Sequence, residues 1–176
     1  MNNSRNLAHI VEEIDYLRAE RGMLLNQGPQ FLVLHGFHKP GSVCLPGETV
    51  ERAFLLRDGK RYPVDLSPSG LIVFDCLCKH RLKPLTATRI AALLSSDPFY
   101  VRYGANLGPN RPPVIIPGRS SIKVYLQRIR EQMAKVFLLA GVEIDPSTVL
   151  SKESTEKNSV FFILRASATC EHHTVF

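Results

Sequence analysis

The stretch RSSIKVYLQRIREQM, residues 119–133, predicts a long amphipathic helix. Its apolar residues recur every three or four positions, as on the buried face of a helix; they are Ile122, Leu126, Ile129 and Met133. At about 100° per residue, the opposite side carries Ser120, Lys123, Val124, Gln127 and Arg128. A helix that is anchored by one face and offers Ser, Lys, Gln and Arg on the other suits insertion into a nucleic-acid groove. A solvated surface helix would have the same pattern.

The composition indicates a globular chain with one sizeable core. Of the 176 residues, 44% are hydrophobic and 22% are charged, as in ordinary soluble proteins. No apolar run approaches the ~18 residues of a membrane span. The N-terminus carries acidic residues where a signal peptide would have an uninterrupted apolar core. We therefore expect a cytoplasmic protein without a membrane partner.

Positive charge is concentrated in one block of the sequence. Residues 79–135 hold eleven Lys and Arg and only two acidic residues, whereas the rest of the chain holds eleven basic and fourteen acidic residues. A basic block in an otherwise mildly acidic chain predicts a polyanionic partner. Nucleic acid fits better than a membrane, because no helix with a lipid-facing aromatic side accompanies the block.

The sequence offers no signature of catalysis or of a bound metal. The four cysteines, Cys44, Cys76, Cys78 and Cys170, follow no disulfide framework, and we expect buried thiols in a reducing compartment. The run Cys76-Leu-Cys78-Lys-His80 has the residue types of a metal site but lacks a second pair of ligands. We find no nucleophile–base pair, phosphate-binding glycine loop or paired carboxylates in a supporting context. We expect a protein that is not an enzyme and uses no cofactor.

Residues 1–30 are predicted to contain an N-terminal helix over 5–25. Its apolar stripe consists of Leu7, Ile10, Ile14, Leu17 and Leu24. Its polar positions carry the acidic residues Glu12, Glu13, Asp15 and Glu20. The stripe must bury against the chain's own core or against the same helix of a second copy. We expect a homodimer through residues 5–25, with docking on the chain's own core as the alternative.

Residues 31–66 predict a small antiparallel β-sheet. The strand candidates are FLVLHGF (31–37), SVCL (42–45), VERAFLL (50–56) and KRYPVDL (60–66). The Asp58-Gly59 step between the last two strands is the strongest hairpin signal of the chain.

Residues 67–168 predict a helical core closed by a hairpin. Helix starts are expected at Ser67-Pro68, Thr86 and Asp97-Pro98. The Gly-, Pro- and Asn-rich residues 104–118 predict an extended loop. After it we expect the helix 120–140, ended by Gly141, and then the hairpin strands 148–154 and 160–166. Residues 169–176 are predicted to be a flexible tail.

Three stretches, taken in order, resemble the DNA-binding domain of OmpR/PhoB-type bacterial transcription regulators. RDGKRYPVDLSPSGLIVFDCL (57–77) is similar to that family's hairpin and first helix, and LTATRIAALL (85–94) to its second helix. SIKVYLQRIREQM (121–133), followed by GVEIDPSTVLSKE and VFFILRA, is similar to the recognition helix, linker and wing. The resemblance implies an α+β fold: a winged helix-turn-helix over residues 67–168, preceded by an antiparallel β-sheet and an extra N-terminal helix. Residues 1–30 are too few for a receiver domain, so we expect no aspartate phosphorylation within this chain.

The resemblance also implies a set of contacts with double-stranded DNA. Helix 120–140 would read the major groove, and the wing over 148–166 would contact the backbone or minor groove. The expected contact residues are Thr86, Arg89, Arg119, Ser120, Ser121, Lys123, Gln127, Arg128, Lys152, Lys157 and Asn158. The first two begin the second helix, the next six belong to the long helix, and the last three belong to the wing.

The sequence departs from the family at several positions. Lys123 stands where the family usually has an acidic residue, so base preference does not carry over. Gly70 replaces the Glu or Gln of a capping box. The loop 104–118 is longer than usual, which weakens the inference that it contacts RNA polymerase or a co-regulator.

The leading hypothesis is therefore a sequence-specific DNA-binding transcription regulator. The alternative is a winged-helix adaptor that binds protein or RNA without reading bases, because fold alone does not determine function. A phosphorylated small-molecule signal could also bind near the loop, where Arg102 and Arg111 supply positive charge.

Overall fold

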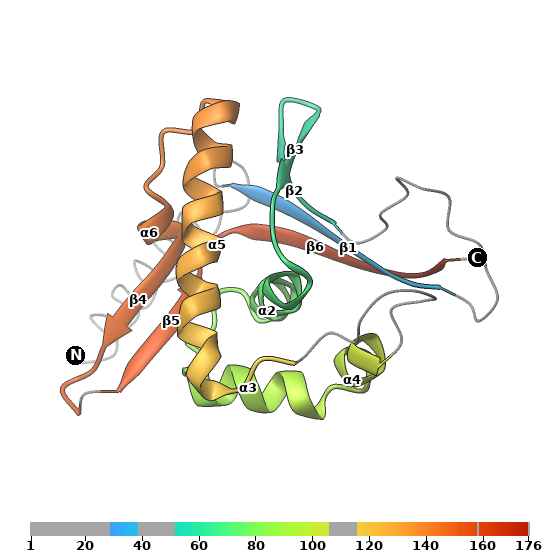
Figure 1. Ribbon diagram of the computed structural model, residues 1–176. Helices are drawn as coiled ribbons and strands as arrows, with labels where there is room; N and C mark the ends of the chain where they lie inside the picture. Colours follow the sequence, from blue (N-terminus) through green and yellow to red (C-terminus); the bar gives the residue numbers. More distant parts are fainter. Residues whose placement is uncertain (1–28, 39–51, 106–115, 158, 176) are drawn as a thin grey trace, which may run out of the picture.

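The computed structural model describes residues 29–38, 52–105, 116–157 and 159–175 of the chain (Figure 1). The predicted N-terminal helix 5–25, the strand candidate 42–45 and most of the predicted loop lie outside these residues. The elements in chain order are β1 (Gln30–His38), β2 (Arg52–Arg57), β3 (Lys60–Val64), α2 (Pro68–Lys79), α3 (Ala87–Ser96), α4 (Pro98–Ala105), α5 (Arg119–Ala140), α6 (Pro146–Val149), β4 (Leu150–Ser154), β5 (Val160–Leu164) and β6 (Ser167–Val175). This mixture of helices and strands confirms the predicted α+β class.

The larger sheet has four strands in the order β3-β2-β1-β6. The pairs β3–β2 and β2–β1 are antiparallel, whereas β1 and β6 run parallel. Two predictions are corrected here. The sheet is mixed rather than antiparallel, and residues 169–175 are part of a strand that pairs with β1 rather than a flexible tail. The pairing of Val33 with Cys170 gives the physical reason, since the C-terminal segment supplies hydrogen-bond partners for the second edge of β1.

The hairpin of β2 and β3 turns at the predicted Asp58-Gly59 step. Both residues have positive φ, 51° at Asp58 and 72° at Gly59. Such a two-residue turn matches the right-handed twist of its strands, and it favours Asp and Gly because both tolerate this backbone conformation. The prediction of this hairpin is confirmed.

A second, two-stranded sheet consists of β4 and β5. Leu85 is joined to this sheet by an isolated β-bridge to Phe162. Its N–H donates to the Phe162 carbonyl at 3.0 Å, and its carbonyl accepts from the Phe162 N–H at 2.8 Å. The predicted start of β4 at residue 148 is wrong: residues 146–149 form the short helix α6. Asp145 begins that helix, where its carboxylate accepts a hydrogen bond of 2.8 Å from the Ser147 N–H.

The predicted helix boundaries are confirmed where capping residues define them. The Ser67 hydroxyl accepts from the Gly70 N–H at 3.2 Å, and Pro68 follows at the first helical position of α2. A Cβ at position 70 would lie 3.2 Å from Ser67 Oγ and 3.7 Å from the Tyr125 ring. A side chain at this position would therefore require a small shift of the Ser67 hydroxyl that caps the helix. Gly141, at φ 66°, ends α5 in the left-handed conformation.

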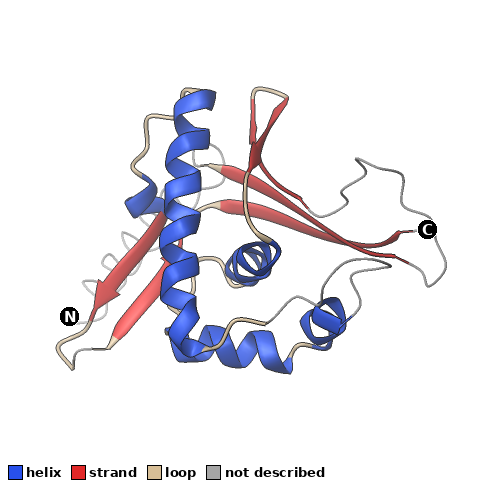
Figure 2. Ribbon diagram, in the orientation of Figure 1, coloured by secondary structure: helices blue, strands red, loops and turns tan. Residues whose placement is uncertain are grey.

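One hydrophobic cluster joins the sheets and helices. The Phe31 ring of β1 meets Phe74 of α2 edge-on, with 5.2 Å between centroids, and stacks on Phe137 of α5 at 6.3 Å. The cluster also contains Phe162 of β5. It therefore includes side chains from both the predicted sheet region, residues 31–66, and the predicted helical region, residues 67–168. Figure 2 shows α5 between the β4–β5 hairpin and the strands of the larger sheet.

A buried polar cluster attaches α4 to α2. Asp75 is fully buried, accepts a 2.5 Å hydrogen bond from the Tyr100 hydroxyl and pairs with Lys79 at 3.2 Å. Burial, followed by the negative charge of Asp75, raises the pKa of Tyr100, so its hydroxyl keeps the proton that it donates. Next to this cluster, Cys76 and Cys78 are buried free thiols, as predicted. Burial raises the pKa of Cys76 from 9.0 to about 12.

Within the described ranges, no helix has the length and apolar character to cross a membrane. The same ranges contain no group of three His, Cys, Asp or Glu side chains placed to hold a metal ion. His80, from the Cys76–His80 run, lies within hydrogen-bond distance of its own helix, with Nδ1 3.1 Å from the Cys76 carbonyl.

Candidate nucleic-acid interface

An open groove of about 750 Å³ lies where α3, α5 and β5 meet. Its lining residues are Thr86, Ala87, Thr88, Arg119, Ser120, Lys123, Ser159, Val160 and Phe162. Four of the eleven predicted contact residues lie here, namely Thr86, Arg119, Ser120 and Lys123. They come from positions more than thirty residues apart in the sequence.

The start of α3 is fixed at this groove by backbone pairing. The two hydrogen bonds between Leu85 and Phe162 tie the residue before the helix to β5. Thr86 then begins the helix, and its Oγ1 accepts from the Arg89 N–H at 3.1 Å. Because the oxygen is used as a cap, the hydroxyl can still donate its hydrogen outward. Thr86 is therefore both a structural residue and a donor at the groove.

The start of α5 lies at the same groove and is built differently. Gly118 precedes the helix and provides no side-chain cap, while its carbonyl accepts from the N–H groups of Ser121 and Ile122 at 3.0 and 3.3 Å. Two helix N-termini therefore face one groove. Each carries the positive end of a helix dipole, and together they favour an anion in the space between them.

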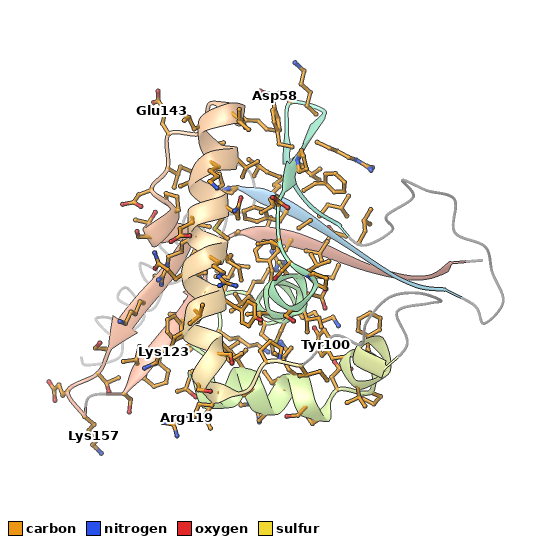
Figure 3. All side chains as sticks on the ribbon, in the orientation of Figure 1. Asp58, Tyr100, Arg119, Lys123, Glu143 and Lys157 are labelled. Carbon is orange, nitrogen blue, oxygen red and sulfur yellow. The ribbon has the colours of Figure 1, made fainter. Side chains whose placement is uncertain are left out.

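Two cationic side chains add to the positive electrostatic potential at the groove. Arg119 and Lys123 are both exposed, and neither forms an ion pair with any residue that the structure describes. Figure 3 shows them at one end of the molecule together with Lys157 at the tip of the β4–β5 hairpin, while Asp58 and Glu143 lie at the opposite end. Arg119, Lys123 and Lys157 thus lie toward the N-terminal end of α5, where the hairpin also carries the exposed acidic residues Glu153 and Glu156.

The buried side of α5 confirms the predicted stripe. Ile122, Leu126, Ile129 and Met133 have no exposed surface, and Val136 and Phe137 extend the stripe toward the C-terminal end. Burial of these side chains fixes the rotation of the helix and thereby determines which residues face outward.

The remaining predicted residues of α5 do not line the groove. Lys123 and Arg128 are five positions apart, which places them about 140° apart around the helix. Arg128 lies on the other flank, with its guanidinium 5.9 Å from the centre of the Tyr125 ring. Gln127 donates to Glu131 at 3.2 Å. Ser121 is half-buried. The structure thus gathers the first turn of α5 and Lys123 into one site and separates them from Arg128.

The predicted wing residues occupy different parts of the hairpin. Lys152 is exposed on β4, opposite Phe162 of β5. Lys157 is exposed at the tip, and Asn158 lies outside the described residues. Arg89 is exposed on α3 but does not line the groove. Arg165, the residue after β5, forms an exposed ion pair with Glu153 of β4 at 2.7 Å.

Arg130 is a residue that the sequence analysis missed. Its Nε–H donates to the Leu150 carbonyl at 2.8 Å, and its guanidinium lies 6.0 Å from the centre of the Phe162 ring. Burial lowers the pKa of Arg130, yet an arginine stays charged. The residue therefore links α5 to both strands of the β4–β5 hairpin. The sequence carries one signal for this role, since Arg130 lies next to the apolar stripe rather than opposite it.

Thr88 and Ser159 were also missed as groove residues. Neither has a sequence pattern that distinguishes it from an ordinary surface hydroxyl.

Searches against family models, curated proteins and solved structures found no match to this chain.

Proposed function

We propose that this protein binds double-stranded DNA as a transcription regulator, with α5 in the major groove and the β4–β5 hairpin against the backbone or the minor groove. One observation carries the proposal: the two helix N-termini, Arg119 and Lys123 converge on a groove beside that hairpin. A phosphate of the DNA backbone fits this arrangement, because backbone N–H groups, hydroxyl donors and two cations all favour an anion.

The order of the elements supports a winged helix-turn-helix of the OmpR/PhoB type. The β2–β3 hairpin leads through Ser67-Pro68 into α2, a bridging segment at Leu85 leads into α3, and the long α5 is followed by a hairpin. Two features differ from the resemblance, namely the parallel strand β6 and the short helix α4 between α3 and α5. Neither lies among the groove residues.

The position of each residue on α5 suggests a division of roles. Lys123 and Arg119, at the groove, would hold phosphate and set the register of the helix on the duplex. Gln127, one turn after Lys123 and exposed, is placed to reach base edges in the major groove. Arg128, stacked near Tyr125, would contact DNA only from the far flank.

A salt titration of DNA binding tests the proposal. The full-length protein should bind duplex DNA with an affinity that falls steeply as the salt concentration rises, because binding releases the cations condensed on the DNA. Lys123→Ala should weaken binding to all sequences and reduce the slope of log affinity against log salt by about 1. Arg128→Ala should have a smaller effect on both quantities.

Lys135→Ala is the matched control. It removes the same charge from the same helix, its side chain is exposed, and it lies about 18 Å further along the helix axis. Equal losses for Lys123→Ala and Lys135→Ala would mean that net charge alone drives binding, which contradicts the proposed site. No binding to any duplex at low salt would reject the function.

Double-stranded RNA of the same sequence separates the regulator from an RNA-binding adaptor. The major groove of A-form RNA is too deep and narrow to admit a helix. The proposal therefore predicts a clear preference for DNA, and a preference for RNA would overturn it in favour of the adaptor.

A further inference from the structure

The two inner strands of the larger sheet, β1 and β2, have apolar side chains on both faces. On β1, Phe31 and Val33 point toward α2 and α5 and belong to the hydrophobic cluster. Because side chains alternate along a strand, Leu32 and Leu34 point to the opposite face. An antiparallel sheet that meets water on one face alternates apolar and polar residues, and β1 does not.

The neighbouring strand β2 follows the same pattern. Ala53 and Leu55 belong to the cluster, while Phe54 and Leu56 point the other way and are half-buried. The register places Leu32 directly beside Phe54. We call the four side chains Leu32, Leu34, Phe54 and Leu56 the rear face.

The rear face looks away from α5, and Leu32 at its centre is buried while the other three side chains are half-buried. Phe31 stacks on Phe137 of α5, so the alternating neighbour Leu32 must point away from that helix. Leu32 is only 7% exposed, yet it is not part of the hydrophobic cluster. Ile163 of β5 has the same property at 8%, next to Phe162, which faces Arg130 of α5. Ile163 belongs to the other sheet, so on the larger sheet it is Leu32 that marks a second apolar surface.

We propose that the rear face is the docking site of residues 5–25 of the same chain. The apolar stripe of this segment requires a partner surface, and the rear face is a surface of matching chemistry. Residue Pro29, just after the segment, is buried and leads directly into β1, an inner strand of the sheet. A 21-residue helix is about 31 Å long, and a nine-residue strand is about 30 Å long, so the two lengths agree.

The short connection favours docking within one chain over a dimer. Only residues 26–29 separate the segment from β1. A tether of only a few residues gives the attached partner an effective concentration of the order of millimolar. A second copy at a lower concentration therefore competes poorly for the same surface. The sequence left this choice open, and the rear face supplies the docking surface that the intramolecular alternative needs.

One cationic side chain lies at the margin of the rear face. Arg61 of β3 lies opposite Leu56, is exposed and stacks near the Phe54 ring at 5.9 Å. The segment carries four acidic residues and three arginines, so its net charge is only −1 and the match to this surface is mainly apolar. Docking would leave the groove at the start of α5 open, because the rear face points away from α5. The inference therefore stands or falls independently of DNA binding.

Hydrogen exchange of the full chain tests the docking. An isolated helix of this length is marginal in water, so amides of residues 10–20 should be protected only if the segment is docked. We expect protection that is equal at low and high protein concentration, with a monomeric mass by light scattering. Protection that appears only at high concentration together with a dimeric mass would assign the surface to a second copy. Absence of protection would also overturn the proposal.

Two substitutions and a control locate the contact. Ile14→Asp, in the apolar stripe, and Phe54→Asp, on the rear face, should each abolish protection of residues 10–20 while the β4–β5 hairpin amides stay protected. Ala19→Asp lies about 140° from Ile14 on a helix and should leave protection unchanged. Equal loss with Ala19→Asp would contradict a face-specific contact. If Phe54→Asp fails to fold, Ile14→Asp and the concentration series still decide the question, since they leave the sheet intact.

Discussion

The cluster around Asp75 and the groove around Lys123 are both polar, but they use their polar groups in opposite ways. In the cluster, the Asp75 carboxylate, the Tyr100 hydroxyl and the Lys79 ammonium are bound to one another. At the groove, Arg119 and Lys123 are exposed and have no acidic partner in the described parts of the chain. Polar groups paired within the protein stabilise the fold, whereas cations left facing solvent beside two helix N-termini are available to a ligand. Substitutions in the first region should therefore change stability, and substitutions in the second should change binding.

The largest expected effect is an alkaline loss of stability that arises in the buried region. Burial raises the pKa of the Cys76 thiol from 9.0 in the unfolded chain to about 12 in the folded one. Above pH 9 the unfolded state binds fewer protons, so stability falls as the pH rises toward 12. The free energy of unfolding should decrease by about 1.4 kcal/mol per pH unit for this group. Urea denaturation at a series of pH values measures the slope.

Cys76→Ala should make that alkaline slope shallower. Val73→Ala is the control, because it truncates another buried side chain of α2 that carries no titratable group. It should lower stability similarly at every pH and leave the slope unchanged. The same slope in both variants would contradict a contribution from Cys76.

The second prediction removes one member of the buried cluster. Tyr100→Phe deletes the donor to Asp75 and should cost about 1.5–3 kcal/mol of unfolding free energy, since a buried carboxylate loses a hydrogen bond. DNA affinity per folded molecule should not change. Tyr62→Phe, at a half-buried tyrosine of β3, should stay within about 0.5 kcal/mol of the parent. A loss of DNA binding by folded Tyr100→Phe protein would break the distinction between the two regions.

The elements with strong local signals were predicted correctly from the sequence. Ser67-Pro68, Thr86 and Gly141 define helix ends through their own backbone and side-chain chemistry, and Asp58-Gly59 does the same for the hairpin. The strand β6 was missed because its partner β1 lies more than a hundred residues earlier, and no local pattern records such pairing. A polar segment such as CEHHTVF resembles a tail until a neighbouring strand supplies its hydrogen bonds.

The candidate site was predicted only in part, for a related reason. Helical spacing correctly separated the buried stripe of α5 from its polar side. The same spacing places Lys123 and Arg128 about 140° apart, but it does not reveal which of the two faces the hairpin, because that depends on where β5 packs. Arg130 was missed for the same reason, since its role depends on the carbonyl of Leu150 twenty residues later.

The third prediction concerns this connection between the groove and the fold. Arg130→Met should cost about 1–2 kcal/mol, because a charged hydrogen bond to the Leu150 carbonyl is lost while some packing on Phe162 remains. Arg130→Lys should not restore the loss, since an ammonium lacks the planar guanidinium that meets both groups. Arg128→Met, near the Tyr125 ring on the other flank, should change stability by less than about 0.5 kcal/mol. Thermal or urea unfolding distinguishes these outcomes.

The fourth prediction tests Thr86, which both caps α3 and offers a hydroxyl donor at the groove. Thr86→Ala removes the cap of α3 and should cost about 1 kcal/mol of stability. It should also weaken DNA binding, because a hydroxyl donor at the groove is lost. Thr86→Ser keeps both functions and should restore both measurements. Recovery of stability without recovery of binding would mean that the hydroxyl acts only as a cap.

The smallest expected change in stability belongs to the groove cation. Lys123→Ala removes an exposed side chain that has no ion-pair partner in the described residues, so the unfolding free energy should shift by less than about 0.5 kcal/mol. Alanine also has the higher helix propensity, which would offset part of any loss. The same substitution is the one expected to reduce DNA affinity and its salt dependence most. A small stability change accompanied by a large binding change would assign Lys123 to a ligand, whereas a marked loss of stability would mean that Lys123 supports the fold as Arg130 does.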